Sequence, residues 1–192
     1  MTESLSQTPS QTVGPFFALA LPWAGGDTLV EQATEGERIT LVGRVVDGDG
    51  APVPDALIEI WQADAEGRYA GPADSHDGAG RDRHFRGFGR CATDGNGQFR
   101  FGTIKPGRVP GPGGVWQAPH IEVAVFARGL LKALFTRCYF PGEESNATDP
   151  VLAVVPEGRR ATLIAIAEHG DDRSFRFDIV LQGRNETVFL VC

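Results

Sequence analysis

His120 and Glu122 are the residues whose types and spacing could bind a metal ion. They stand two positions apart in an otherwise apolar run, and residues i and i+2 of a β-strand point to the same face. An imidazole and a carboxylate together bind divalent metals well, and a loop histidine, His76 or His84, could supply a third ligand. A His-x-Glu pair is also common as a hydrogen-bonded pair on a strand, with the loop histidines in solvent. The residues leave both interpretations open, and a buried Glu122 would need a partner that the sequence does not identify.

Other candidate metal donors are few. The chain has two tyrosines, Tyr69 and Tyr139, and Tyr139 lies in an apolar run where a structural role is expected. The three cysteines, Cys91, Cys138 and Cys192, are widely spaced and form no C-x-x-C pair. This spacing argues against a zinc site or a thiol redox centre.

Composition and charge limit the partners that this chain can have. Its 192 residues are enough for one domain with a substantial core. The 25 acidic and 18 basic residues give a net charge of −7, which disfavours nucleic acid or an anionic membrane surface as a partner. No apolar run approaches the ~18 residues of a membrane span, and the polar N-terminus lacks the features of a secretion signal. We therefore expect a cytoplasmic protein, in which an acidic ligand would need local basic residues.

The sequence predicts an all-β chain. Short β-rich runs are separated by Gly, Pro, Asp and Asn, a pattern typical of an antiparallel β-sandwich. The runs predicted as strands cover residues 38–46, 56–62, 98–104, 121–127, 134–140, 160–168, 175–181 and 187–191. Asp-Gly-Asp-Gly at 47–50 and Asp-Gly-Asn-Gly at 94–97 supply turns between them. A long loop is expected over 63–89 and an extended N-terminal arm over 1–37, which leaves 38–192 as the sandwich domain.

Several motifs resemble the intradiol ring-cleaving dioxygenases, iron(III) enzymes that open catechol rings between the two hydroxyls. The matching stretches are Trp-Gln-Ala-Asp at 61–64, Gly-Arg-Tyr at 67–69, Gly-Arg-Cys-Ala-Thr-Asp at 89–94, Thr-Ile-Lys-Pro-Gly at 103–107 and Ala-Pro-His-Ile at 118–121. The alternating run 41–61, together with 93–101, also resembles the core of transthyretin-like β-sandwiches. The resemblance implies a sandwich of transthyretin-like or Ig-like layers and a role in catechol cleavage.

The resemblance also implies that most iron ligands are missing from this chain. Iron-bearing members of the family hold the metal with two tyrosinates and two histidines, one tyrosine following the Lys-Pro-Gly turn and the histidines forming a His-x-His pair. Here Val109 stands near the first position and Glu122 replaces the second histidine, while His120 and Tyr69 remain. The expectation is a vestigial metal site at His120, Glu122 and Val109 with no metal in this chain, and Fe(III) bound instead by a partner chain.

Further matches at 8–16, 126–129, 176–179 and 186–189 resemble the iron-free chain of two-chain members of the family. In such members the N-terminal arm reaches the active site held by the partner, and the resemblance assigns Thr12, Gly14 and Pro15 to the wall of that site. Glycine lets the backbone approach closely and proline stiffens it, which suits a wall built from main chain. The residues alone would equally allow a polar tail that docks for stability.

Arg128 is the candidate substrate-side residue of this chain. Taken by itself, an arginine after an apolar strand is usually a surface residue or an ion-pair partner. The resemblance instead places the arginine of Phe-Ala-Arg-Gly at the mouth of an aromatic pocket, where a guanidinium can stabilise a carboxylate or a catecholate.

Three functional hypotheses follow. The first is an iron-free subunit that assembles with an iron-bearing chain in a large hetero-oligomer acting on a small aromatic acid and O2. The second is a transthyretin-like module that binds a small ligand without chemistry. The third is a self-sufficient metalloenzyme that uses His120, Glu122 and a loop histidine.

Overall fold

The computed structural model describes residues 20–69 and 82–191, and the all-β prediction is confirmed. The strands are β1 Arg38–Val46, β2 Leu57–Trp61, β3 Phe88–Ala92, β4 Gln98–Ile104, β5 Val109–Pro110, β6 Trp116–Gln117, β7 His120–Phe126, β8 Leu134–Tyr139, β9 Ile166–Glu168, β10 Asp171–Arg176 and β11 Ile179–Val180. The helices within these ranges are short: α2 Pro150–Val154, α3 Glu157–Arg160, and the 3-10 helices η1 Pro112–Gly114, η2 Glu144–Thr148 and η3 Ala161–Leu163.

The strands form two main sheets. Four strands, in the order β3-β2-β7-β8, make one wholly antiparallel sheet. In the other, β1 pairs with β4 in an antiparallel ladder and with β10 and β11 in parallel. The two parallel pairings correct the prediction of a purely antiparallel fold. They arise because the chain leaves β8, passes through α2, α3 and η3, and then places β10 and β11 beside β1. Parallel strands need a long crossover connection of this kind.

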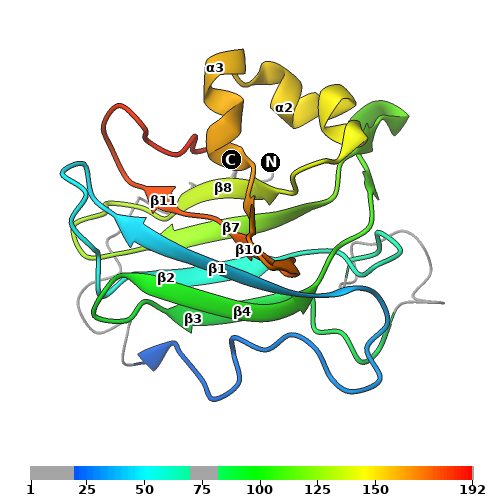
Figure 1. Ribbon diagram of the computed structural model, residues 1–192, viewed down its shortest axis with the longest axis horizontal. Helices are drawn as coiled ribbons and strands as arrows, with labels where there is room; N and C mark the ends of the chain where they lie inside the picture. The colour runs from blue at the N-terminus through cyan, green and yellow to red at the C-terminus, as the bar shows by residue number, and fades with distance from the viewer. Residues whose placement is uncertain (1–19, 70–81, 192) are drawn as a thin grey trace, which may run out of the picture.

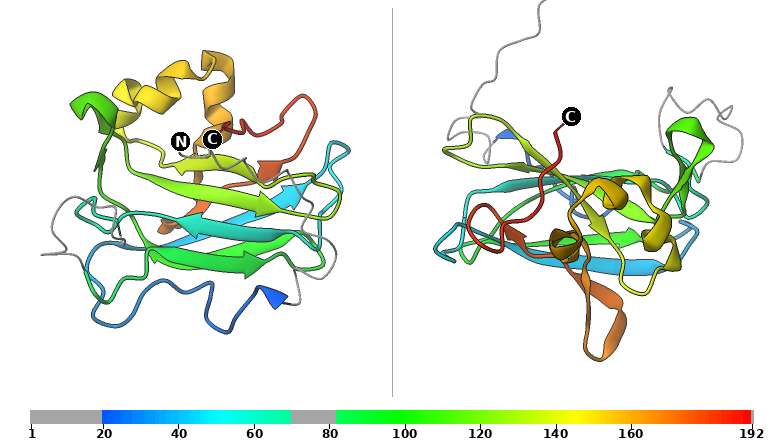
Figure 2. Two further views of the ribbon diagram at one scale, coloured as in Figure 1. Left: turned by 180° about the vertical axis from the view of Figure 1, so that it is seen from behind. Right: turned by 90° about the horizontal axis from the view of Figure 1, so that it is seen from above.

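The two sheets share one hydrophobic core. Leu41 of β1 and Phe101 of β4 belong to the same cluster as Ile58, Ile121 and Val125 of the opposite sheet, and all five are fully buried. Each such side chain contributes about 1.5–3 kcal/mol by leaving water. The edge-on view shows the sheets as two layers, with α2 and α3 at the margin near β8 and the β9–β10 hairpin projecting from the body (Figures 1 and 2).

Some predicted strands are wrong. Residues 160–168 hold the end of α3, then η3, and only the short β9. The run begins Arg-Ala-Thr-Leu, and Arg, Ala and Leu favour helical turns as readily as a strand. In the range 187–191 the structure has one isolated bridge, between Leu190 and Phe135. Strand β3 was not predicted, because Gly89 and Arg90 interrupt the expected alternation.

The described part of the predicted arm packs on this chain. Leu29 is buried in the core, and its amide donates to the carbonyl of Gly102 at 2.9 Å. The carbonyl of Gly26 accepts from the amide of Arg90 at 2.8 Å. Residues 20–37 are therefore integrated with the sheets, whereas Thr12, Gly14 and Pro15 lie outside the described residues. Within the described ranges, no helix has the length and hydrophobicity to cross a membrane.

Candidate functional site

The outer face of β7 and β8 carries the polar residues around His120. The two strands pair in register so that His120 faces Tyr139 and Glu122 faces Arg137. The intervening residues Ile121 and Cys138 point the other way and are fully buried. Strand periodicity thus separates the core from a polar cluster on the opposite side of the same sheet.

His120 is held in one orientation within this cluster. Its side chain is buried, and Nδ1 lies 2.7 Å from the carbonyl oxygen of Ala118. A carbonyl can only accept, so Nδ1 carries a proton and donates to it. Nε2 of the ring lies 3.4 Å from the Tyr69 hydroxyl and 3.5 Å from Oε1 of Glu122. The imidazole therefore presents Nε2 to the tyrosine and the carboxylate.

Tyr69 stays a neutral phenol in this setting. Burial, and to a lesser degree the charge of Glu122, raise the pKa of Tyr69 to about 12. Its ring also packs edge-on against Trp61, with ring centroids 5.6 Å apart. A phenol with so high a pKa does not become an anionic ligand at neutral pH without a metal ion to displace its proton.

Arg137 is the partner of Glu122 that the sequence did not identify. Its Nη2 lies 2.6 Å from Oε1 of Glu122, and Nη1 donates to Oε1 of Gln117 at 2.6 Å. Burial, the largest influence on Glu122, raises its pKa, but the hydrogen bond to His120 and the charge of Arg137 outweigh burial and leave that pKa below its ordinary value. The carboxylate is thus ionised, and the guanidinium neutralises it.

Asp149 connects this cluster to the helices. It is fully buried and accepts from the Tyr139 hydroxyl at 3.0 Å and from the amide of Ala118 at 2.8 Å. It also caps α2 by accepting from the amides of Val151 and Leu152. The residue that starts α2 therefore fixes both the strand end that carries His120 and the tyrosine beside Arg137.

Val109 lies at the border of the same cluster. It is buried in β5 and pairs in register with Gln117 of β6, the residue that accepts from Arg137. The structure therefore brings His120, Glu122 and Val109 to one region, with an apolar side chain at the position of Val109.

Arg128 lies in a different place. It follows the end of β7, whereas His120 begins that strand, so the two Cα atoms are separated by roughly 25 Å of extended chain. Its side chain is 66% exposed and forms an ion pair with Asp55. Among the described residues, the predicted site residues therefore form two separate groups, one near each end of β7.

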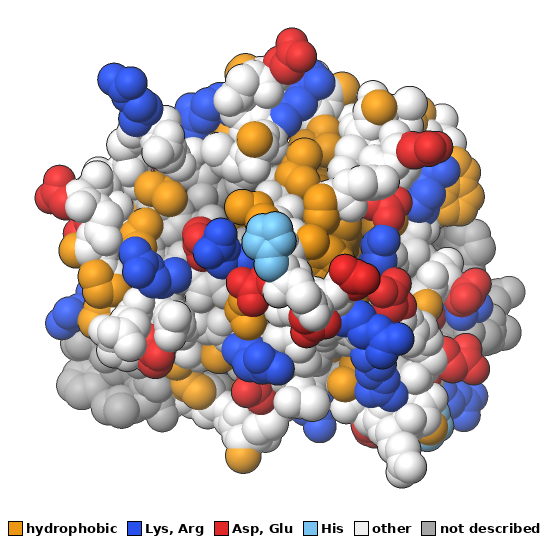
Figure 3. Space-filling view, viewed as in Figure 1, with side chains coloured by type: hydrophobic (Ala, Val, Ile, Leu, Met, Phe, Trp, Pro, Cys, Tyr) orange, Lys and Arg blue, Asp and Glu red, His pale blue; other side chains and the backbone are white. Residues whose placement is uncertain are grey.

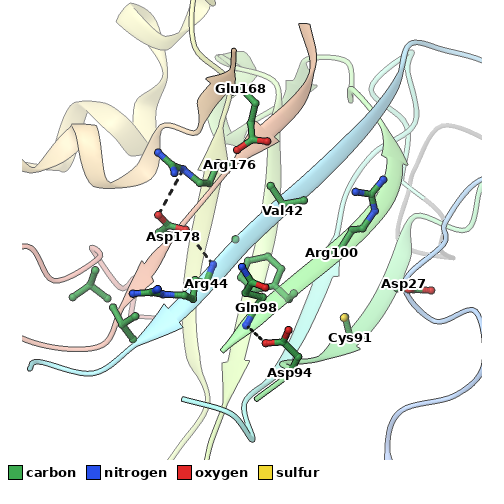
Figure 4. Close-up of a pocket in the computed structure, with 14 residues that line it drawn as sticks. Asp27, Val42, Arg44, Cys91, Asp94, Gln98, Arg100, Glu168, Arg176 and Asp178 are labelled. Atoms are coloured by element: carbon green, nitrogen blue, oxygen red, sulfur yellow. Dashed lines mark hydrogen bonds and ion pairs between the residues drawn. The ribbon is translucent and has the colours of Figure 1, made fainter. Parts of the chain in front are cut away.

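A surface groove of about 880 Å³ lies on the outer face of the other sheet, along β1 and β4. Arg44, Arg100 and Arg176 line it together with acidic residues (Figure 4). Asp178 accepts from the amide of Arg44 at 3.1 Å and lies 3.8 Å from Arg176. Figure 3 shows charges of both signs interspersed over this face. The groove holds none of the predicted site residues, and its charges offset one another.

The comparisons with known proteins agree with the residue pattern. A sequence profile described as Dioxygenase matches residues 13–183, which is most of the chain. The dioxygenase domain of a dioxygenase carbohydrate-binding protein fusion from Streptomyces sp. SirexAA-E has a similar structure, with a TM-score of 0.64 and 31% identity over 93% of this chain and 99% of that chain. The chain belongs to the intradiol ring-cleavage dioxygenases.

Within that family, the chain is similar to the α chain of a two-chain enzyme. It is 44% identical to the protocatechuate 3,4-dioxygenase alpha chain of Burkholderia cepacia, over 97% of this chain and 98% of the relative. It is 43% identical to the beta chain of that enzyme in the same organism, over 79% of this chain and 67% of the relative. The match to the α chain extends over almost the full length of both proteins.

Intradiol dioxygenases are iron-dependent, but the residues around His120 do not fit a ferric centre. Val109 offers no donor atom, and the guanidinium of Arg137 is a cation bonded to the one available carboxylate. Across residues 20–69 and 82–191, no group of three or more His, Cys, Asp and Glu side chains could hold a metal ion. The alternative site with His84 is wrong, because that exposed histidine pairs with Glu31 at 3.1 Å, and His76 lies outside the described residues.

Three residues of this cluster were not predicted from the sequence: Gln117, Arg137 and Asp149. The Asp-Pro pair at 149–150 is a recognisable helix start and could have been found. Arg137 had no local signal, because its partner lies on the neighbouring strand.

Proposed function

We propose that this chain is the iron-free α subunit of a protocatechuate 3,4-dioxygenase. The assembly would cleave protocatechuate between its hydroxyls, adding both atoms of O2 to give 3-carboxy-cis,cis-muconate in aromatic catabolism. Fe(III) would be bound by a homologous β chain, with several αβ pairs forming a large hetero-oligomer. The observation that carries this proposal is the pocket around His120, where Glu122, at a position that bears a metal ligand in iron-bearing members, is ion-paired with Arg137 of the same chain.

The substrate-side role of this chain rests on Arg128, Thr12, Gly14 and Pro15. Arg128 is exposed and is separated from its own chain's pocket by the length of β7, so it is available to a site on a neighbouring subunit. Its guanidinium would stabilise the carboxylate of an aromatic acid by a charge-assisted hydrogen bond. Thr12, Gly14 and Pro15 would form the main-chain wall of the same site.

Exposed aromatic residues support contact with a partner. Trp61 and Trp116 are each about half exposed, and Phe88 pairs in register with Trp61 on the sheet that also carries His120. Aromatic side chains of this kind are enriched at protein interfaces. We also infer that the two layers are those of a transthyretin-like sandwich covering 38–192. Of the arm, residues 1–37, the part that precedes the packed segment 20–37 would be directed to the partner.

Co-expression with the cognate β chain tests the proposal. The mixed complex should contain iron and should consume O2 when protocatechuate is added, whereas this chain expressed alone should do neither. Metal analysis of both preparations separates subunit function from a self-sufficient enzyme. A complex without protocatechuate-dependent O2 uptake, or a lone chain with bound iron and activity, would contradict the assignment.

A further inference from the structure

We propose that the guanidinium of Arg137 is a built-in cation that takes the place of a metal ion in this pocket, and that removing it uncovers a divalent-cation site formed by Tyr69, His120 and Glu122. The proposal concerns only groups of this chain. It does not depend on the substrate or partner proposed above.

The donor atoms of the pocket already have the spacing of metal ligands. The Tyr69 hydroxyl lies 3.4 Å from Nε2 of His120, and Nε2 lies 3.5 Å from Oε1 of Glu122. Two ligands of a tetrahedral ion with bonds of about 2.1 Å are roughly 3.4 Å apart. An imidazole nitrogen, a carboxylate and a phenol oxygen are also an acceptable ligand set for a borderline divalent ion.

Arg137 competes with such an ion for the carboxylate. Its Nη2 bonds Oε1 of Glu122, the same oxygen that faces His120. The arginine side chain is 15% exposed, so little water is present to weaken this attraction. A positive charge fixed at this oxygen both repels an incoming cation and occupies a position that the cation would need.

The guanidinium is anchored from its other side. Nη1 donates to Oε1 of Gln117 and lies 3.4 Å from the Tyr139 hydroxyl, which in turn donates to the buried Asp149. Strands β6 and β8 and the start of α2 thus hold the cation against Glu122. An ordinary surface ion pair has no such support, and most surface ion pairs contribute little to the stability of the folded protein.

Replacing Arg137 by methionine tests the proposal in the full-length chain. Co2+ is the probe, because its visible absorption reports inner-sphere ligands, and thermal unfolding is followed with and without the metal. Wild type should bind no Co2+ in this pocket. Arg137→Met should bind one ion per chain, with Tm rising about 5–10 °C at a metal concentration of about 100 Kd.

Matched variants test whether Co2+ binding requires the loss of Arg137 itself and the presence of the Glu122 carboxylate. Arg90→Met removes another largely buried arginine of the same sheet, which pairs with Glu59 at 2.7 Å, and it should leave the chain unable to bind Co2+. The double variant Glu122→Gln/Arg137→Met should lose the metal again, because it lacks the carboxylate ligand. If Arg137→Met does not fold, Arg137→Gln preserves polarity without charge and carries the same expectation.

Three results would overturn the proposal: Arg137 variants that bind no more Co2+ than wild type, a double variant that still binds it, or a wild-type chain that already holds the ion through these residues. None of these measurements uses protocatechuate or a second subunit. Their outcome is therefore independent of the O2-uptake experiment.

Discussion

Glu122 sets the electrostatics of the pocket at the scale of single residues. Its carboxylate lies against a guanidinium on one side and an imidazole on the other, so the pocket favours an anion at this position and a neutral phenol at Tyr69. In a metal centre the positive ion would favour ionised tyrosine instead. The protonation state of Tyr69 therefore distinguishes a cluster held by Arg137 from a metal site.

Tyr69 should stay protonated at pH values where a free tyrosine ionises. Its pKa is raised to about 12, mainly by burial, and burial also raises the pKa of Tyr139. Above the unfolded pKa of about 10 the unfolded chain loses these protons and the folded chain keeps them, so stability should fall as pH rises from about 10. Ultraviolet titration of folded wild type at about pH 10.5 should show little tyrosinate, and Tyr69→Phe should remove almost none of the signal.

The same titration in guanidinium chloride provides the control. There both tyrosines should ionise near pH 10, and Tyr69→Phe should halve the change in absorbance. A large tyrosinate signal from Tyr69 in the folded protein near neutral pH would mean that a cation other than Arg137 is bound beside it.

At this scale, the candidate metal-ligand residues could be predicted from the sequence, but the cation that neutralises Glu122 could not. His120, Glu122 and Tyr69 were recognised from local motifs, and the structure brings all three together. Arg137 lies 15 positions along the chain from Glu122, and only the β7–β8 register places them opposite each other. A one-residue change of register would turn the arginine to the other face of the sheet, so no local pattern could identify the pair.

At the scale of elements, Phe177 and Phe99 lie so close to β1 that one glycine is required. A Cβ atom at Gly43 would overlap the carbonyl oxygen of Phe177 and the ring of Phe99. Gly43→Ala should therefore destabilise the protein by about 1–3 kcal/mol or more, since neither the backbone nor a packed ring can move freely. Urea unfolding measures the change.

Gly102 gives a matched control in the partner strand. It pairs with Thr40 of β1, and a Cβ atom there would meet no atom within 4 Å. Gly102→Ala should change stability by less than about 0.5 kcal/mol or increase it slightly, because alanine restricts the unfolded chain. Equal losses in the two variants would show that glycine is needed for backbone freedom at both positions, not for space at Gly43.

Asp149 should be the most sensitive polar residue of the helical segment. Asp149→Ala removes the cap of α2 and leaves the amide of Ala118 and the hydroxyl of Tyr139 without their acceptor. The loss should be about 3 kcal/mol, combining a lost cap with unsatisfied buried donors. Glu157→Ala, in the exposed first turn of α3, should cost less than about 0.5 kcal/mol in the same denaturation experiment, and a comparable loss would argue against the capping role.

Elements with a clean alternation were the ones that the sequence could predict. The run 38–46 coincides with β1 and 98–104 with β4, because apolar and polar residues alternate along both. The run 160–168 is mostly apolar and does not alternate beyond Thr162. Asp149 and Pro150 begin a series of helical turns upstream that continues through Leu163. The secondary structure of this segment is therefore set by tertiary context, because it belongs to the crossover that brings β10 beside β1.

At the scale of the whole molecule, β7 separates two groups of candidate site residues. One end carries a closed polar cluster that includes His120, and the other leads to the exposed Arg128. Under the proposed function, Arg128 would serve a site on a neighbouring subunit, because it lies far from the polar cluster of its own chain. The arrangement would suit a subunit that has no metal centre of its own and whose loop after β7 contributes Arg128 to the active site of a neighbouring subunit.

Arg128→Ala should therefore damage catalysis in the αβ complex without damaging this chain. Because Arg128 is two-thirds exposed, its removal should change stability by less than about 0.5 kcal/mol, whereas loss of a charge-assisted hydrogen bond to a substrate carboxylate should lower kcat/KM about 10- to 100-fold. Arg176→Ala, which removes an exposed arginine paired with Asp178, should leave kcat/KM unchanged. Steady-state O2 uptake and the iron content of each complex check this. Unchanged kinetics in Arg128→Ala would exclude contact with the substrate, and loss of iron would mean that this arginine supports the metal centre of the partner instead.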